Sequence, residues 1–185
     1  RARRGTMKTS ILISLVLGLC ALVSAQPADK MNKYLKRTGA KFLEAKAKEE
    51  GVLALPSGML YRVIKEGETS GKKSSPNVGD SCEVTYSGKL KDGTPFDSGT
   101  TSFAPNQVIK GWTEALQLMC EGDKFELFIP YEMAYGERGS PPKIPGYSPL
   151  VFEVEIHKVK EGGKSCAEAK EELAKKLKEA QDKKE

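Results

Sequence analysis

The chain has 185 residues, of which 38% are apolar and 30% are charged, and its formal net charge is +5. This length accommodates one domain of ordinary size with extensions at its ends. Four positive charges and no negative ones lie within residues 1–25, so the rest of the chain has a net charge of only +1. A nearly neutral chain has no electrostatic basis for binding nucleic acid, and we expect no such partner.

Residues 7–25 have the features of a secretory signal peptide. Lys8 supplies a basic start, residues 11–23 are a short apolar run, and Val23-Ser24-Ala25 fits a cleavage site of small residues. The run is short for a membrane span, so an uncleaved anchor is the less favoured alternative. We expect a mature chain that begins at residue 26 in the secretory pathway (endoplasmic reticulum lumen, periplasm or extracellular space), with no membrane attachment.

The region after the cleavage site, residues 26–50, is predicted to be a helical extension. Its helix is expected over residues 29–50, with Asp29 as the N-cap and Gly51 as the stop signal. Lysines and glutamates fill one face, and an apolar stripe lies on the other, formed by Met31, Tyr34, Leu35, Phe42 and Leu43. We expect this stripe to pack on the chain's own domain. A dimerisation arm is the alternative, so the protein is expected to be a monomer or a weak homodimer.

From Met59 onward the apolar pattern changes to the period of two that is typical of strands. Asp92-Gly93 is a strong signal for a hairpin turn. A single helix is expected over residues 108–119, with Trp112 on its apolar face. One short helix among antiparallel strands predicts an α+β domain over residues 51–160, with the helix packed on one sheet. Strands are expected over residues 59–64, 81–90, 124–130 and 150–160.

Two further segments do not follow the strand pattern. Residues 135–149 form a long loop whose four prolines and three glycines favour a fixed shape. A loop this long is more often functional than incidental. Residues 161–185 are rich in Ala, Glu, Lys and Leu, with Leu173 and Leu177 as a thin stripe. We expect a charged tail that is a solvated helix or disordered, rather than a specific partner-binding helix.

Three cysteines follow the signal peptide, and an odd number in an oxidising compartment leaves at least one without a partner in the same chain. Cys82 belongs to an alternating strand and is expected to be a buried small apolar residue. Cys120 ends the helix and Cys166 follows the last strand, so we predict that these two pair. Such a bridge contributes about 4 kcal/mol in the chain-entropy model.

Several kinds of chemistry are excluded by the residues available. His157 is the only histidine and lies on the charged face of the last strand, so we expect neither a histidine-based triad nor a metal cluster. No P-loop, dinucleotide-binding glycine pattern or nucleophile elbow is present, and we expect no cofactor. Residues 92–119 instead gather apolar side chains around one carboxylate, that of Asp97. An apolar pocket with one charge suits the binding of a ligand and a change in its conformation better than bond cleavage.

A set of motifs occurs in order across residues 51–160: Val84-Thr85-Tyr86-Ser87-Gly88, Asp92-Gly93, Phe96-Asp97-Ser98, Gln107-Val108-Ile109-Lys110-Gly111-Trp112, Ala134-Tyr135-Gly136 and Leu150-Val151-Phe152. Together these motifs closely resemble FKBP-type peptidyl-prolyl cis-trans isomerases. The helical extension after a signal peptide is similar to that of secreted, Mip-like members. The resemblance implies a half-barrel antiparallel sheet wrapped around the Trp112 helix. It also implies rotation of X–Pro bonds in proline-containing polypeptide substrates, which assists protein folding.

The resemblance also assigns site residues. The catalytic set is Asp97, Tyr135, Ile109 and Trp112: the indole forms the pocket floor, and the Ile109 N–H and the Tyr135 hydroxyl contact the ligand. The substrate-binding set is Tyr86, Phe96, Phe103, Val108, Ile144 and Phe152. Rapamycin-like macrolides are further expected ligands.

This chain departs from the family pattern in the loop after Asp97, which is shortened and lacks an arginine, and at Gln107, Ser140 and Lys143. These departures bear on ligand affinity and substrate preference more than on fold. Each aromatic residue taken alone is explained by core packing, but the whole constellation favours a site. A non-catalytic chaperone or peptide-binding module of the same fold is the alternative function.

Overall fold

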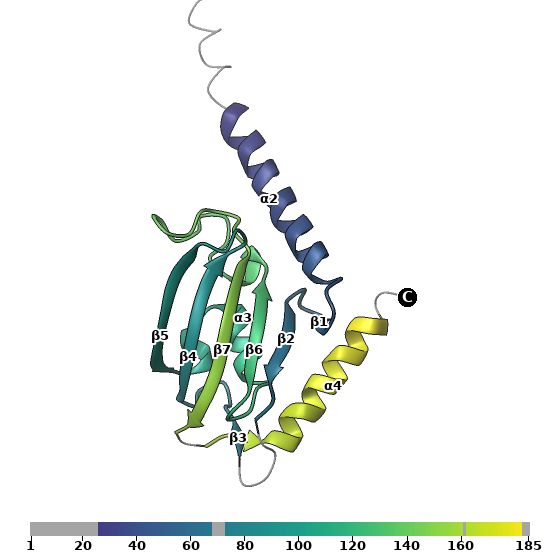
Figure 1. Cartoon of the computed structure of the whole chain (residues 1–185), viewed down its shortest axis with the longest axis vertical. Coiled ribbons are helices and arrows are strands. Elements are labelled where there is room, and N and C mark those ends of the chain that lie inside the picture. The colour runs from purple at the N-terminus through teal and green to yellow at the C-terminus, as the bar shows by residue number, and fades with distance from the viewer. Residues whose placement is uncertain (1–25, 68–72, 161, 183–185) are drawn as a thin grey trace, which may run out of the picture. The chain divides into compact units, whose positions relative to one another are not determined.

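The computed structural model describes residues 26–67, 73–160 and 162–182, so the signal peptide expected within residues 1–25 lies outside it. Its centre is a six-stranded antiparallel sheet in the order β1-β2-β6-β7-β4-β5 (Figure 1). Within the described ranges, no helix is both long and apolar enough to cross a membrane. The strands of this sheet are β1 Val52–Ala54, β2 Leu60–Lys65, β4 Cys82–Leu90, β5 Pro95–Phe103, β6 Lys124–Ile129 and β7 Leu150–Val159.

The hairpin between β4 and β5 turns at Asp92-Gly93, as its sequence predicts. Gly93 has φ +88°, and the Leu90 N–H donates to the Thr94 carbonyl over 2.9 Å. The Asp92 carboxylate accepts from the Thr94 N–H at 2.9 Å, which closes the turn. Because β4 pairs with β7 on its other side, residues of β5, β4 and β7 lie in adjacent rows of the sheet.

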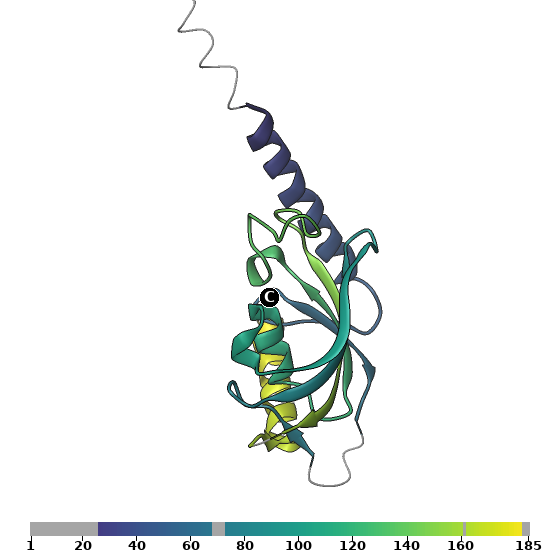
Figure 2. The same ribbon diagram turned by 90° about the vertical axis from the view of Figure 1, so that its left-hand side faces the viewer.

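The sheet curves around α3, which runs from Lys110 to Leu116 (Figure 2). This helix is shorter than the expected span of 108–119, because Val108 and Ile109 have extended backbones. Short 3₁₀ turns precede and follow this region, η1 at Pro105–Gln107 and η2 at Tyr131–Met133. The core lies between the helix and the sheet and includes Trp112, Ala115, Leu116, Val84, Leu127, Phe152, Val154 and Ile156.

Helix α2 spans Gln26–Lys46, three residues earlier at its start than expected, so Asp29 lies in its first turn and is not the N-cap. The part of this helix from Leu35 onward belongs to a compact unit that extends to residue 185. Within this unit, the Phe42 ring meets the Phe128 ring edge-on at 6.4 Å. Phe42 of the expected stripe therefore contacts the sheet, whereas Met31 and Tyr34 of the same stripe are exposed.

The C-terminal segment is a helix, which was one of the two expected states, but this helix is docked on the core and not solvated on all sides. Strand β8, Lys164–Ser165, pairs with β3, Ser74–Ser75, and α4 follows directly over Cys166–Asp182. Leu173 and Leu177 pack against the core, and Ala169 is fully buried. The predicted disulfide between Cys120 and Cys166 is confirmed, and Cys82 is a buried free thiol as expected. The sparse apolar stripe is sufficient for docking because the disulfide anchors the first turn.

Candidate active site

A pocket of about 390 Å³ opens beside α3, and most of the predicted site residues line it. Its apolar wall comes from β4, β5, β7 and the segment that leads into α3. The only ionisable carboxylate in its lining is that of Asp97, and the lining contains no histidine or cysteine. The lining residues are Tyr86, Phe96, Asp97, Phe103, Gln107, Val108, Ile109, Trp112, Tyr135 and Phe152.

The floor of the pocket is the Trp112 indole, which is 4% exposed. Three rings contact it edge-on, with centroid distances of 5.2 Å to Tyr86, 5.9 Å to Phe103 and 5.2 Å to Phe152. Edge-to-face packing at these distances is favourable and restricts rotation of each ring. The floor is therefore held rigid before any ligand arrives.

A second aromatic contact closes the side of the pocket, where Phe96 meets Phe152 edge-on at 5.4 Å. Both rings cross the backbone of Gly88 on β4. A Cβ at this position would lie 2.6 Å from an atom of each ring, which is closer than side chains tolerate. Glycine at position 88 is thus what allows the two rings to meet over β4.

Asp97 is held at the rim by hydrogen bonds to both of its oxygens. The Tyr86 hydroxyl donates to Oδ2 at 2.9 Å, and the Ser98 N–H donates to Oδ1 at 3.0 Å. Burial of the phenol, together with its bond to Asp97, raises the pKa of Tyr86. Tyr86 therefore stays protonated at neutral pH and keeps the carboxylate oriented.

The Ile109 N–H and the Tyr135 hydroxyl in the pocket wall have no acceptor among the described residues, and neither does the buried Nε1–H of Trp112 in the floor. Ile109 is extended, with φ −60° and ψ 152°, and immediately precedes α3. Burial, and then the charge of Asp97, raises the pKa of Tyr135, so its hydroxyl remains a donor at neutral pH. Unpaired donors beside apolar rings suit the carbonyl oxygens of an extended peptide.

Ile144 does not line this pocket but an adjoining hollow of about 280 Å³, which shares Phe96, Asp97 and Tyr135 with it. The backbones of Ser140 and Ile144 exchange two hydrogen bonds, of 2.8 and 3.0 Å, which turns the loop on itself and buries Ile144. Lys143 closes the hollow from one side, and its Nζ donates to the Phe96 carbonyl at 3.0 Å.

One pocket residue, Gln107, was not among the predicted site residues. It ends the η1 turn, and its Oε1 accepts from the Ala104 N–H at 3.3 Å. The comparison of motifs marks Gln107 as a departure from the family pattern but does not place it in the pocket, because its place in the wall depends on how the turn leads into α3. In the part of the chain that the structure covers, no three His, Cys, Asp or Glu side chains are placed to hold a metal ion.

Comparison with known proteins identifies the family. Residues 72–157 match the model of the FKBP-type peptidyl-prolyl cis-trans isomerase, and residues 19–63 match the domain that is amino-terminal to such isomerases. The macrophage infectivity potentiator of Trypanosoma cruzi is 49% identical over 162 residues, which cover 84% of this chain and 81% of that protein. The FKBP-type 22 kDa peptidyl-prolyl cis-trans isomerase of Escherichia coli is 50% identical, over 64% of this chain and 58% of its own.

A solved structure supports the same assignment at the level of fold. The crystal structure of FkpA from Escherichia coli matches with a TM-score of 0.65 and 34% sequence identity, over 85% of this chain and 75% of that one. The chain therefore belongs to the FKBP-type family and is a peptidyl-prolyl cis-trans isomerase.

Proposed function

We propose that this isomerase rotates X–Pro bonds in polypeptides of the secretory pathway by holding the twisted amide in the pocket above Trp112. One observation carries the proposal: a rigid aromatic pocket whose wall presents two unpaired donors, the Ile109 N–H and the Tyr135 hydroxyl. Such a pocket can accept an apolar proline ring and the carbonyl groups on either side of it. No proton transfer or covalent step is needed.

The catalytic effect follows from the polarity of the amide. Rotation about the bond breaks amide resonance and faces a barrier of about 18–20 kcal/mol. The planar amide is more polar than the twisted one, because resonance places negative charge on oxygen and positive charge on nitrogen. An apolar pocket therefore disfavours the planar ground state relative to the twisted transition state. This is differential binding, the general source of enzymatic rate enhancement.

Each site residue has a role in this proposal. Trp112 supports the proline ring, and Tyr86, Phe96, Phe103, Val108 and Phe152 keep water away from it. The Ile109 N–H and the Tyr135 hydroxyl hold substrate carbonyls, while Asp97 complements dipoles at the rim. Ile144 in the adjoining hollow would contact a neighbouring residue of the peptide. The same contacts would accept a rapamycin-like macrolide, and no nucleic-acid partner is proposed.

The organisation of the chain completes the proposal. Residues 1–25 would direct export and be removed, which places the enzyme in the endoplasmic reticulum lumen, the periplasm or the extracellular space. Residues 26–50 would be a helical extension, residues 51–160 the isomerase domain, and residues 161–185 a C-terminal extension that braces it. The mature protein would act as a monomer or a weak homodimer.

The test is isomerisation of a short Leu-Pro peptide by protein that lacks residues 1–25. We expect activity that rapamycin blocks. Asp97→Ala and Trp112→Ala variants that still fold should lose about ten-fold or more in kcat/KM, the factor that corresponds to about 1.4 kcal/mol of transition-state binding. Ser98→Ala is the control, because its side chain lies outside the pocket. A folded but inactive wild type would leave a peptide-binding module instead of an enzyme.

A further inference from the structure

We propose that Lys36 on α2 is a positioning residue for Tyr135, acting through Glu137 and Tyr147 of the loop that carries the tyrosine. The proposal rests on the role given above to the Tyr135 hydroxyl. It assigns to the C-terminal half of α2 a direct part in isomerisation, in addition to packing on the sheet. All of these residues belong to the compact unit of residues 35–185.

Lys36 makes two contacts with the loop. Its Nζ lies 3.2 Å from Glu137 Oε1 and 4.8 Å from the centroid of the Tyr147 ring. The bond to Lys36, followed by a hydrogen bond to Tyr147, lowers the pKa of Glu137. A cation shared between a carboxylate and an aromatic face fixes both groups at once. The ammonium thus joins two loop residues that lie on opposite sides of the Ser140–Ile144 turn.

The contact continues from Tyr147 to the residue that follows the proposed catalytic tyrosine. The Tyr147 N–H donates to the Gly136 carbonyl at 3.1 Å, and the Gly136 N–H donates to the Tyr131 carbonyl at 2.8 Å. The rings of Tyr131 and Tyr147 also meet edge-on at 5.3 Å. Gly136 is therefore held on both sides by residues of this cluster, and Tyr135 is bonded to it through one peptide unit.

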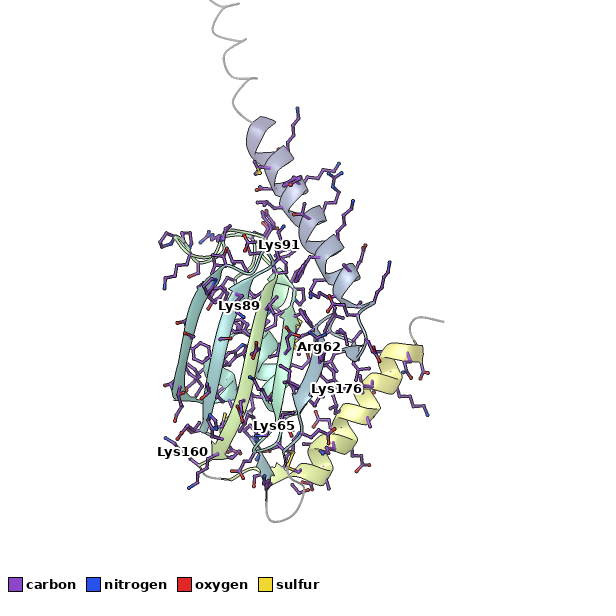
Figure 3. The ribbon with its side chains drawn as sticks, in the orientation of Figure 1. Arg62, Lys65, Lys89, Lys91, Lys160 and Lys176 are labelled. Atoms are coloured by element: carbon purple, nitrogen blue, oxygen red, sulfur yellow. A yellow bond between two sulfur atoms is a disulfide. The ribbon has the colours of Figure 1, made fainter. Side chains whose placement is uncertain are left out.

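The helix approaches the loop closely beside Lys36, and glycine at position 39 makes this approach feasible. A Cβ on Gly39 would lie 3.3 Å from Pro149 Cδ and 3.5 Å from the Tyr147 carbonyl oxygen. On the other side, Lys91 in the β4–β5 turn donates to Thr38 Oγ1 at 2.7 Å. Figure 3 shows Lys91 beside α2. Helix α2, the loop of residues 135–149 and the β4–β5 hairpin thus contact one another near Thr38 and Gly39.

The position of Tyr135 depends on this support because its side chain makes little contact that would hold it in place. The side chain is 42% exposed and forms no hydrogen bond within the described ranges. Its hydroxyl can therefore be directed into the pocket only as accurately as the loop backbone is placed. A small shift of a positioning group is enough to lower a catalytic rate.

The first test replaces Lys36 by Met, which keeps the length of the side chain and removes the charge. We expect kcat/KM for the Leu-Pro peptide to fall by about two- to five-fold, the range for an exposed ion pair that is part of a larger contact. Lys41→Met is the matched control, since Lys41 is an exposed lysine of the same helix without an ion pair in the described part of the chain. Lys36→Arg should restore the rate, because arginine both pairs with carboxylates and stacks on rings.

A second test separates positioning from a merely structural role. If Lys36 acts through the Tyr135 hydroxyl, Lys36→Met should change kcat/KM by less than about 1.5-fold in a Tyr135→Phe background, because coupled residues are not additive. Additive effects would overturn the proposal. Gly39→Leu gives an independent perturbation. Leucine has a higher helix propensity than glycine, but its side chain obstructs the approach of α2 to Pro149. The variant should therefore lower kcat/KM by about five-fold or more.

The outcomes distinguish this inference from the proposed function. An active wild type with Lys36→Met and Gly39→Leu variants of equal activity would overturn the positioning role alone. An inactive wild type would overturn the catalytic function and this inference with it. Reduced activity in both variants, an active Lys41→Met control and loss of the effect in the Tyr135→Phe background would support it.

Discussion

Two helices are attached to the same unit by different kinds of contact. Helix α4 begins at a disulfide and lays Leu173 and Leu177 against the core. The part of α2 that follows Leu35 is attached by the Phe42 ring, by the close approach of Gly39 to Pro149, and by polar contacts such as the exposed pair of Lys36 and Glu137. One attachment is covalent and apolar, while the other combines packing with charge.

The two attachments also reach different parts of the site. Lys176 of α4, labelled in Figure 3, lies 3.6 Å from Glu114 on α3, the helix that carries the pocket floor. Lys36 of α2 instead contacts the loop that carries Tyr135 at the rim. The two helices thus contact different parts of the proposed site: α4 contacts the helix that carries its floor, and α2 contacts the loop at its rim.

The largest effect is expected from removing the disulfide with Cys120→Ala and Cys166→Ala together. The bridge closes a separation of 46 residues. In the chain-entropy model its loss lowers the free energy of unfolding by about 4 kcal/mol. Denaturant unfolding measures this loss. The kcat/KM should stay within about two-fold of wild type, since none of the described residues of α4 lines the pocket.

Reduction supplies the control for this prediction. A reducing agent should lower the stability of the wild type to that of the double variant and leave the double variant unchanged. A large fall in kcat/KM together with the stability would contradict the division between the two helices. It would mean that α4 acts on the floor of the site as strongly as α2 acts on its rim.

The next effect concerns the core beneath α4 and appears at alkaline pH. Tyr61 of β2 stacks on Phe125 at 5.4 Å, and burial raises its pKa to about 12. The folded state therefore keeps a proton that the unfolded state loses near pH 10. The resulting stability is complete below pH 10 and is lost as pH rises toward 12, at about 1.4 kcal/mol per pH unit.

Tyr61→Phe should remove this slope and leave the stability at pH 8 little changed, because burial alone raises the pKa of Tyr61 and no hydrogen bond of its hydroxyl contributes among the described residues. Unfolding curves between pH 8 and 11 measure the difference between the two proteins. Cys82, whose pKa burial raises to about 11, contributes equally to both and cancels in the comparison. Equal slopes in the two proteins would contradict the assignment to Tyr61.

A smaller effect is expected from Phe42→Ala, which removes the ring–ring contact of α2 with Phe128 of the sheet. The Phe42 side chain is half-buried and meets Phe128 edge-on, so its loss should free the second half of α2 by about 1–2 kcal/mol. Amide hydrogen exchange should accelerate in residues 38–46 and not in α4. Faster exchange in both helices would show that their attachments are coupled.

The helices were harder to predict from the sequence than the sheet. The sheet, the hairpin and the pocket are carried by local alternation and by motifs such as Phe96-Asp97-Ser98, so the fold was predicted well. The docking of α4 was missed because a stripe of two leucines on a charged helix is too weak a signal. The cysteine pair contained that information, since a bridge to Cys120 brings the start of this helix to the core.

Most of the residues that line the pocket were named from the sequence, but their arrangement was predicted only in part. Ile144 lies in the adjoining hollow and Gln107 in the main pocket, since both positions depend on how a loop closes on itself. The contact between Lys36 and Glu137 spans 101 residues of sequence. No periodicity predicts which exposed lysine of a helix meets a distant loop, and only the folded structure does so.

The smallest expected effect is the one that tests the contrast between the helices most directly. The side chains of Lys36 and Glu137 are 46% and 64% exposed, so salt should screen their attraction. Between low salt and about 0.5 M potassium chloride, the kcat/KM of the wild type toward an uncharged Leu-Pro peptide should fall by about two-fold, toward that of Lys36→Met. The Lys36→Met variant supplies the baseline, because every other salt effect acts on it as well. Parallel salt dependence in the two proteins would mean that α2 is held by Phe42 and Gly39 alone. If the kcat/KM of the wild type instead falls to that of the variant, the charge of Lys36 positions the rim of the site.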